Sequence, residues 1–162
     1  MTVEIPLSQG FVAIVDDEDA PAVLAAGKWT AQARPWTVYA RRNVRCEDGR
    51  QATLYLHTFL TGWSMVDHAN RDGLDNRRAN LRPATRSQNA RNRTVRSDSV
   101  SGFKGVYWDA RAQRWEARIY VAGRGIWLGR FDDLVDAARA YDAAAREHYG
   151  EYAWLNFPEV TR

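Results

Sequence analysis

Hydrophobic and polar positions follow the period of β-strands in several short stretches of the chain. An apolar run at residues 11–15 precedes the acidic residues 16–19, which predicts a strand followed by a loop. Residues 37–40 and 52–56 predict a further pair of strands around a turn at 47–49. From residue 115 to 121 apolar and polar side chains alternate, which predicts a strand with one polar face, and residues 126–131 predict its return partner.

A helix is predicted after this second pair of strands. Asp132 or Asp133 is placed to cap its first turn, apolar residues recur at helical spacing from Leu134 to His148, and Gly150 ends it. Its many alanines allow the helix to lie close against a three-stranded sheet. These patterns together predict an α+β protein.

The chain divides into segments of different character. Residues 1–56 predict a small β-rich layer with a packing or positioning role, whereas residues 57–98 are dense in Asn, Asp and Arg. Residues 97–102 are small and polar, which predicts a linker. We therefore expect two domains, 1–98 and 99–162, the first subdivided at residue 56.

Composition excludes several classes of protein. The chain has 162 residues, of which 45% are hydrophobic and 27% charged, an average mixture for a globular protein. No apolar run approaches the ~20 residues that span a membrane, and no basic-then-apolar leader begins the chain. We expect no membrane partner. The single cysteine, Cys46, excludes an internal disulfide and a zinc or redox site built from cysteines.

Positive charge is concentrated in the middle of the chain. Residues 1–56, 57–100 and 101–162 carry net charges of −1, +4 and 0, and the stretch from Arg77 to Arg96 holds seven arginines and no acidic residue. Such a block is typical of a surface that meets polyanions. An ordinary solvated helix face is the alternative, which the absence of balancing acids disfavours.

The same segment holds side chains suited to phosphodiester hydrolysis. His68 can accept a proton near neutral pH, Asp67 offers a hard anionic oxygen, and Asn89 offers an amide oxygen. These residues predict one Mg²⁺ or Mn²⁺ ion and no zinc, with His68 activating water. Seven arginines around them are candidates to hold DNA phosphates: Arg71, Arg77, Arg78, Arg82, Arg86, Arg91 and Arg93.

The spacing of this segment resembles the HNH (His-Me finger) endonucleases of phages and homing elements. The similarity extends over residues 56–60, 66–82 and 87–89, with Thr58 where that family commonly has Arg. It implies a ββα-metal finger in which His68 is the general base and Asp67 and Asn89 are the metal ligands. Asn80 would orient the His68 ring or tie the loop between the strands. It also implies a phage- or mobile-element-encoded protein in a bacterial cytoplasm.

The last third of the chain resembles the plant ethylene-response-factor (APETALA-two type) DNA-binding domain. The motifs are residues 105–108, 114–119, 127–131, 137–142 and 155–158. In that family a three-stranded antiparallel sheet enters the DNA major groove and one helix packs behind it. The resemblance places six residues on the DNA-facing surface: Tyr107, Asp109, Arg118, Tyr120, Gly125 and Trp127. Several arginines of the family are absent, and we expect Arg114, Arg124 and Arg130 to contact phosphates instead.

The individual side chains leave some choices open. Trp115 is predicted to be in the core because it shares a strand face with Ala117 and Ile119, whereas Trp127 fits either core packing or stacking on a sugar. His57 is expected to pack or to hydrogen-bond under the site, and His148 is expected to cap or pack at the end of its helix.

The hypothesis drawn from the sequence is a metal-dependent endonuclease acting on double-stranded DNA, either nicking or cutting both strands, as a monomer or a homodimer. The alternative from another class is a non-catalytic, sequence-specific DNA-binding regulator with a nuclease remnant. RNA as a substrate ranks lower, because the basic segment has no aromatic platform for single-stranded RNA.

Overall fold

The computed structural model describes residues 1–95 and 98–158 of the chain. Contacts divide it into two compact units, Met1–Asn89 and Ala90–Arg162, and each unit is described by itself. The sequence placed the division at residues 98 and 99. Residues 91–93 lie within the second unit, where Lys104 Nζ donates to the backbone oxygens of Arg91 and Arg93 at 2.5 and 2.7 Å. Arg96, and Ser97 of the expected linker, lie outside the described residues.

The first unit begins with an antiparallel hairpin. Strand β1 (Thr2–Pro6) pairs with β2 (Val12–Asp16), and the short 3-10 turn η1 (Ser8–Gly10) connects them. Helix α1 (Ala20–Ala25) follows, with proline in its first turn, where the missing N–H costs no hydrogen bond.

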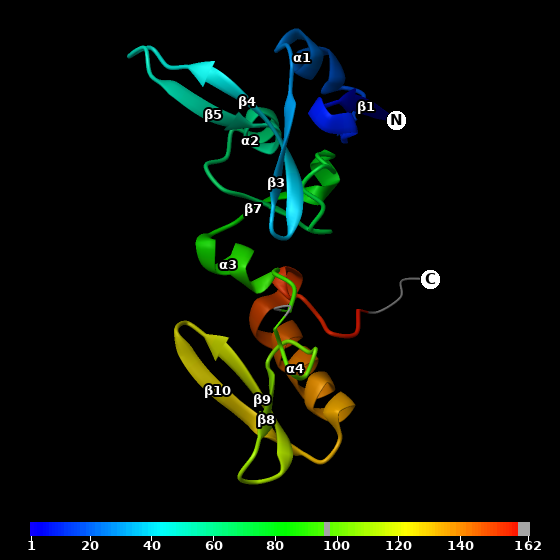
Figure 1. Cartoon of the computed structure of the whole chain (residues 1–162), viewed down its shortest axis with the longest axis vertical. Helices are drawn as coiled ribbons and strands as arrows, with labels where there is room; N and C mark the ends of the chain where they lie inside the picture. The colour runs from blue at the N-terminus through cyan, green and yellow to red at the C-terminus, as the bar shows by residue number, and fades with distance from the viewer. Residues whose placement is uncertain (96–97, 159–162) are drawn as a thin grey trace. The chain divides into compact units, whose positions relative to one another are not determined.

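A three-stranded antiparallel sheet follows, in the order β3 (Thr30–Arg34), β4 (Thr37–Arg45) and β5 (Gln51–Tyr55), as Figure 1 shows. It leads directly into helix α2 (Leu56–Thr61), which ends at Gly62 in the left-handed conformation. The core of this unit joins the hairpin, α1 and the sheet. Its buried members include Ile5, Val15, Trp29 and Leu56.

The segment predicted to be a metal finger contains short elements. Strand β6 (Val66–His68) pairs antiparallel with β7 (Leu81–Pro83), the turn η2 (Arg78–Asn80) precedes β7, and helix α3 (Arg86–Arg91) follows. Strands of three residues make few ladder hydrogen bonds, so this region depends on side-chain contacts for its shape.

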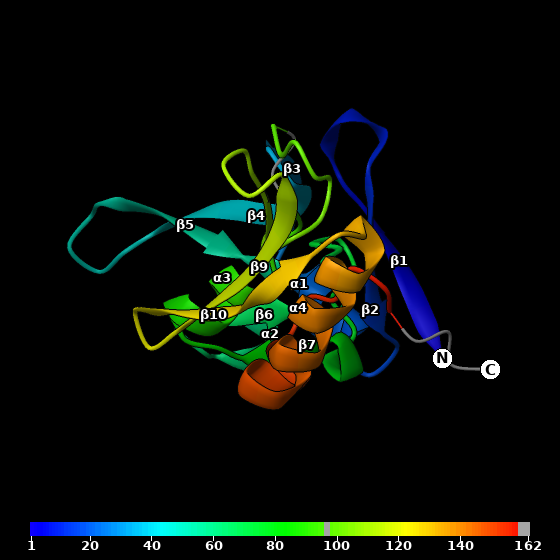
Figure 2. The same ribbon diagram turned by 90° about the horizontal axis from the view of Figure 1, so that it is seen from below.

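The second unit is a three-stranded antiparallel sheet with one long helix behind it. The sheet order is β10 (Arg124–Phe131), β9 (Arg114–Val121) and β8 (Val106–Asp109). Helix α4 (Leu134–Tyr149) lies along this sheet, as Figures 1 and 2 show, and a short turn η3 (Gly150–Tyr152) ends it. Asp133 caps the helix by accepting hydrogen bonds from the backbone of Val135 and Asp136.

Small side chains bring α4 close to the sheet. The core is formed on one side by four buried alanines of the helix and on the other by buried apolar residues of the strands: Ala137, Ala138, Ala144, Ala145, Val106, Ala117 and Ile119. Gly105 shows how close the approach is, because a Cβ atom there would overlap the ring of Tyr141 on the helix.

The mixed fold and the sheet-and-helix unit confirm the sequence prediction in its coarse form. Strands β6 and β7 and helix α3 form in the segment of the expected ββα-metal finger, and the metal finger itself stays a prediction. Within residues 1–95 and 98–158, no group of three His, Cys, Asp or Glu side chains gathers to hold an ion. Among the helices so described, none is long and apolar enough to cross a membrane.

Candidate functional site

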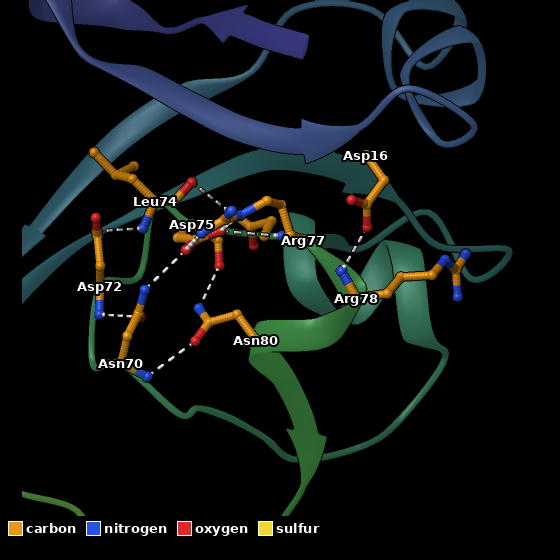
Figure 3. A network of polar contacts seen from close by, with 9 residues as sticks. Asp16, Asn70, Asp72, Leu74, Asp75, Arg77, Arg78 and Asn80 are labelled. Carbon is orange, nitrogen blue, oxygen red and sulfur yellow. Dashed lines mark hydrogen bonds and ion pairs between the residues drawn. The ribbon is translucent and has the colours of Figure 1, made fainter. Parts of the chain in front are cut away.

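The loop between β6 and β7 is held in place by a network of polar contacts, drawn in Figure 3. Asn80 ties the loop together: its Oδ1 accepts from the Asn70 backbone at 2.9 Å, and its Nδ2 donates to the Asp75 backbone oxygen at 2.7 Å. Asn70 Nδ2 also donates to Asp75 Oδ2 at 2.8 Å. The loop is joined to β2, because Ile14 exchanges backbone hydrogen bonds with Leu74 and Asn76. The Asn80 side chain therefore holds the two sides of this loop together.

His68 lies at the end of β6 and is buried, with 5% of its surface exposed. The rings of His57 and Tyr39 surround it, at centroid distances of 5.1 and 5.7 Å, and its Nε2 lies 3.5 Å from Asn76 Oδ1. Burial lowers the pKa of His68, opposed by the Asn76 contact and by the carboxylate of Asp67. A general base has to reach the proton that it abstracts, and little of this ring is open to an incoming phosphodiester.

Asp67, the predicted metal ligand, is engaged by an arginine. It is the register partner of Arg82 across the β6–β7 pair, and its Oδ2 accepts from both Nε and Nη2 of Arg82, at 2.9 and 2.7 Å. Both side chains are largely buried. Asn89, the other predicted metal ligand, lies beside β6, because its Nδ2 donates to the Val66 backbone oxygen at 3.2 Å.

A divalent ion at this place would compete with the guanidinium group for the same carboxylate oxygen. Removing that partner is costly, because a buried charge would lose its counter-charge. In this arrangement Arg82 is the cation beside Asp67 Oδ2. The Mg²⁺ or Mn²⁺ site stays a prediction.

The arginines of the basic segment are divided among several structural contacts. Arg77 pairs with Asp75 at 2.6 Å, and Arg78 pairs with Asp19 at 2.7 Å while its backbone N–H donates to Asp16 at 2.7 Å. The acidic residues 16–19, expected to be a loop, thus neutralise part of the basic block.

The remaining candidates of that block have different surroundings. Arg91 lies over the ring of Tyr149 at 4.7 Å, and Arg71, Arg86 and Arg93 are exposed. A count of charges along the sequence therefore overstates the positive surface that is free to meet phosphates.

The second unit presents one open sheet face. The register pairs Tyr107 with Glu116, Arg118 with Trp127 and Tyr120 with Gly125, and directly paired residues of antiparallel strands share a face. The helix α4 covers the other face. The aromatic side chains on the open face are 54% (Tyr107), 56% (Tyr120) and 58% (Trp127) exposed. A hollow on this face is lined by Tyr107, Glu116, Arg118 and Tyr120.

The structure brings together on this face the residues that the sequence placed there. Arg114 also lies at its edge, paired with Asp132 at 2.8 Å, whereas Arg124 is exposed at the hairpin turn. Trp115 is half-buried, packs under the sheet and contacts Trp108 edge-on at 4.9 Å. The open position of Trp127 agrees with stacking rather than core packing.

One acidic side chain of this face, Glu116, was missed by the sequence reasoning. Glu116 pairs with Arg118 two residues along the same strand, and the hydrogen bond that Arg118 donates to Glu116 is the main cause that raises the pKa of Arg118. Arg130 pairs with Asp109 at 2.9 Å and lies 3.9 Å from Glu116. The sequence could have shown this pair, because residues two positions apart in a strand, such as Glu116 and Arg118 in β9, lie on the same face of the sheet.

Two family models match parts of the chain. Residues 101–151 match the AP2 domain, and residues 64–91 give a weak match to the HNH endonuclease family. The first match covers strands β8 to β10 and helix α4, which are the sheet and the helix described above.

Curated relatives agree with the AP2 match. Dehydration-responsive element-binding protein 2D of Arabidopsis thaliana is 51% identical over 51 residues, which is 30% of this chain and 25% of the relative. AP2-like ethylene-responsive transcription factor TOE2 of the same plant is 39% identical over 77 residues, 48% of this chain and 16% of the relative. APETALA2-like protein 2 of Oryza sativa subsp. indica is 44% identical over 57 residues, which is 35% of this chain and 13% of the relative. The chain thus spans a quarter or less of the length of these relatives.

These comparisons overturn three expectations drawn from the sequence. The metal-dependent endonuclease is wrong as the function, and so are hydrolase, nuclease and homing as descriptions, because the relatives are named as DNA-element-binding proteins and transcription factors. A phage- or mobile-element-encoded protein in a bacterial cytoplasm is also corrected, since these relatives are plant proteins. The burial of His68 and the engagement of Asp67 by Arg82 give a physical reason consistent with the first correction.

Proposed function

We propose that this chain is a non-catalytic, sequence-specific DNA-binding protein that recognises duplex DNA with the open face of its β8–β9–β10 sheet. The observation that carries this proposal is the composition of that face, where exposed aromatic rings lie beside guanidinium groups on a sheet backed by α4. In this proposal the segment around His68 is a nuclease remnant that keeps its fold through the Asn80 loop network and the Asp67–Arg82 pair.

The sheet has the features needed to read a major groove. That groove admits a β-ribbon, and arginine is the commonest side chain that reads guanine edges. Arg118 lies in the middle of β9, with its register partner Trp127 beside it on β10. The aromatic rings supply flat surfaces that pack on sugars or thymine methyl groups without adding charge.

The test is selection of a preferred sequence from random duplexes by the full chain, followed by competition against unselected DNA at one fixed salt concentration. Arg118→Ala and Trp127→Ala are expected to reduce the ratio of specific to non-specific affinity, by roughly tenfold or more for a guanine contact worth about 1–3 kcal/mol. Arg139→Ala is the matched control, because Arg139 is an exposed arginine of α4. No enriched sequence, or equal effects of Arg118→Ala and Arg139→Ala, would refute the proposed interface.

The non-catalytic part has its own test. Supercoiled plasmid incubated with the protein and Mg²⁺ or Mn²⁺ is expected to stay intact, and duplex binding is expected to be the same in EDTA. Metal-dependent nicking that disappears in His68→Ala would overturn this part of the proposal while leaving DNA recognition by the sheet in place.

A further inference from the structure

The β3–β4–β5 sheet of the first unit has one purely polar face. The register pairs Thr30 with Arg41, Gln32 with Tyr39, and Arg41 in turn with Tyr55, so these residues share a face. The opposite face carries small and apolar residues, for example the pairs of Ala31 with Ala40 and Val44 with Ala52, and it includes the buried Ala40. The face with Ala40 is therefore turned to the core, whereas the polar face packs Tyr39 and Tyr55 against His57 and leaves its arginines outside the core.

Three arginines lie on the polar face, and none of its positions is acidic. Arg34 and Arg45 are exposed and Arg41 is half-buried. Within residues 1–95 and 98–158, no carboxylate forms an ion pair with any of the three. An ordinary solvated face mixes charges of both signs, whereas this face carries positive charge alone.

The contrast with the arginines of the basic segment is direct. Arg77, Arg78 and Arg82 are each held by a carboxylate. Arg42, on the apolar face of the same sheet, packs its guanidinium 5.7 Å from the ring of Trp29.

Neutral partners hold two arginines of the polar face, Arg34 and Arg41, in place. Arg34 Nη2 donates to Tyr55 Oη at 3.2 Å, and that hydroxyl donates to Gln32 Oε1 at 2.8 Å. Arg41 Nη1 donates to Asn43 Oδ1 at 3.1 Å and lies 3.4 Å from Thr53 Oγ1. These contacts orient the guanidinium groups without cancelling their charge. Asn and Gln are also the side chains that pair with adenine edges.

The loop after β6 covers one end of the face. Gly73 N donates to Thr37 Oγ1 at 2.9 Å, and a Cβ at Gly73 would overlap Tyr39. Arg34, the register partner of Thr37, remains exposed at that end, and along β4 the open part runs from Arg41 to Arg45. These two residues are four positions apart, about 13 Å along a strand. One strand of B-DNA carries one phosphate per ~3.4 Å of helix axis, and because the strand winds around that axis, a straight row of this length faces fewer than four phosphates.

We propose that this face, defined by Arg34, Arg41 and Arg45 with Gln32, Asn43 and Thr53 between them, is a second binding surface for duplex DNA, separate from the sheet of the C-terminal unit. The basis is charge complementarity: an acid-free, pre-oriented set of guanidinium and amide groups matches a regular array of phosphates. The inference does not rest on the function proposed for the C-terminal unit.

The test measures the salt dependence of binding to a duplex of about 30 base pairs by the full chain, where removing one phosphate-binding charge flattens the log–log slope by ~0.9. In Arg34→Gln/Arg41→Gln/Arg45→Gln, glutamine keeps a polar side chain but removes the charge, and the slope is expected to flatten by about 2–3. Arg50→Gln is the matched control, because Arg50 lies beside the same sheet but is paired with Asp48.

Arg45→Gln alone keeps the test decisive if the triple variant unfolds, since Arg45 is exposed and its substitution is expected to flatten the slope by ~0.9. Equal slopes for the wild type, Arg45→Gln and Arg50→Gln would overturn the proposal, and an acidic protein partner for the face would give that same result.

A second arm separates this surface from the C-terminal sheet by repeating the measurement in Arg118→Ala/Trp127→Ala. Residual duplex binding that the three glutamine substitutions abolish supports the proposal. No residual binding in Arg118→Ala/Trp127→Ala overturns it and leaves the proposed function standing. Conversely, Arg118→Ala/Trp127→Ala could bind duplex DNA as tightly as the wild type while the triple glutamine variant loses binding. That result would refute the proposed function and leave the second binding surface standing.

Discussion

Asp142 joins the end of the chain to helix α4, and its removal is expected to unfold the second unit selectively. The residue is 2% exposed. Its Oδ1 accepts from the Asn156 backbone at 2.8 Å and from Asn156 Nδ2 at 3.1 Å, and its Oδ2 accepts from the Phe157 backbone at 2.8 Å. Asn156 in turn exchanges hydrogen bonds with the backbone of Lys104, at 2.7 and 3.2 Å. One carboxylate thus links the helix to the C-terminal segment and, through Asn156, to Lys104 in the loop before β8.

The magnitude follows from the hydrogen bonds that the substitution removes. Asp142→Ala leaves two backbone N–H groups without acceptors, and each unsatisfied buried group costs about 1–3 kcal/mol. Phe157 is partly exposed, so water satisfies part of that loss, and we expect about 3 kcal/mol for the unit. Asp142→Asn keeps one acceptor oxygen, and its amide N–H₂ replaces the other, so about half that loss is expected.

Thermal unfolding followed by circular dichroism measures the change, with helix α4 as the main helical signal. For a unit of this size about 3 kcal/mol corresponds to a fall in melting temperature of at least ~10 °C. Asp136→Ala is the control, because Asp136 is exposed in the first turn of the same helix and its loss is expected to cost under ~1 kcal/mol. Equal melting temperatures for Asp142→Ala and Asp136→Ala would refute the structural role assigned to Asp142.

Two further predictions concern stability. Gly105→Ala places a Cβ into the ring of Tyr141 at a backbone φ of +74°, so we expect the second unit to lose its cooperative unfolding transition in circular dichroism. A variant with a normal transition would contradict the close packing of α4. Burial lowers the pKa of His57 to about 3, so the unfolded state binds more protons than the folded state below its ordinary pKa near 6.5. The first unit should therefore lose stability as the pH falls from about 6.5 towards 3, by at most ~1.4 kcal/mol per pH unit, and His57→Gln should reduce that slope in urea titrations at each pH.

The parts of the fold that the sequence predicted are those encoded by local patterns. The alternation from residue 115 to 121 matched strand β9, and the helical spacing from Leu134 onward matched helix α4. Each pattern is long enough to distinguish the two-residue period of a strand from the 3.6-residue period of a helix. Strands β6 and β7 have three residues each, too few for an alternating pattern to show.

The candidate site was harder to predict because its charges are neutralised across the fold. Arg78 and Asp19 are separated by 59 positions, so no local window contains both partners. The run of arginines was therefore interpreted as a phosphate-binding field, although Arg77, Arg78 and Arg82 have carboxylate partners. Conversely, Arg34, Arg41 and Arg45 belong to a segment whose net charge is negative, and their shared face emerges only from the register of three strands.

Glu116 is expected to limit non-specific binding by the open sheet face of the second unit. Its side chain is 13% exposed and lies between Arg118 and Arg130, so both guanidinium groups have a carboxylate beside them before any DNA arrives. A phosphate has to displace that carboxylate, whereas a guanine edge offers Arg118 two acceptors in return.

Glu116→Gln removes the charge and keeps the shape of the side chain. Affinity for unselected duplex DNA should rise several-fold, and the salt slope should steepen by up to ~1 for each arginine released to a phosphate. The ratio of specific to non-specific affinity should fall, because only the non-specific complex gains. Asp132→Asn makes the same change in net charge at the exposed ion pair with Arg114, and it is expected to leave that ratio unchanged. If both variants raise non-specific affinity equally and preserve the ratio, Glu116 acts through net charge alone and has no part in selecting the sequence.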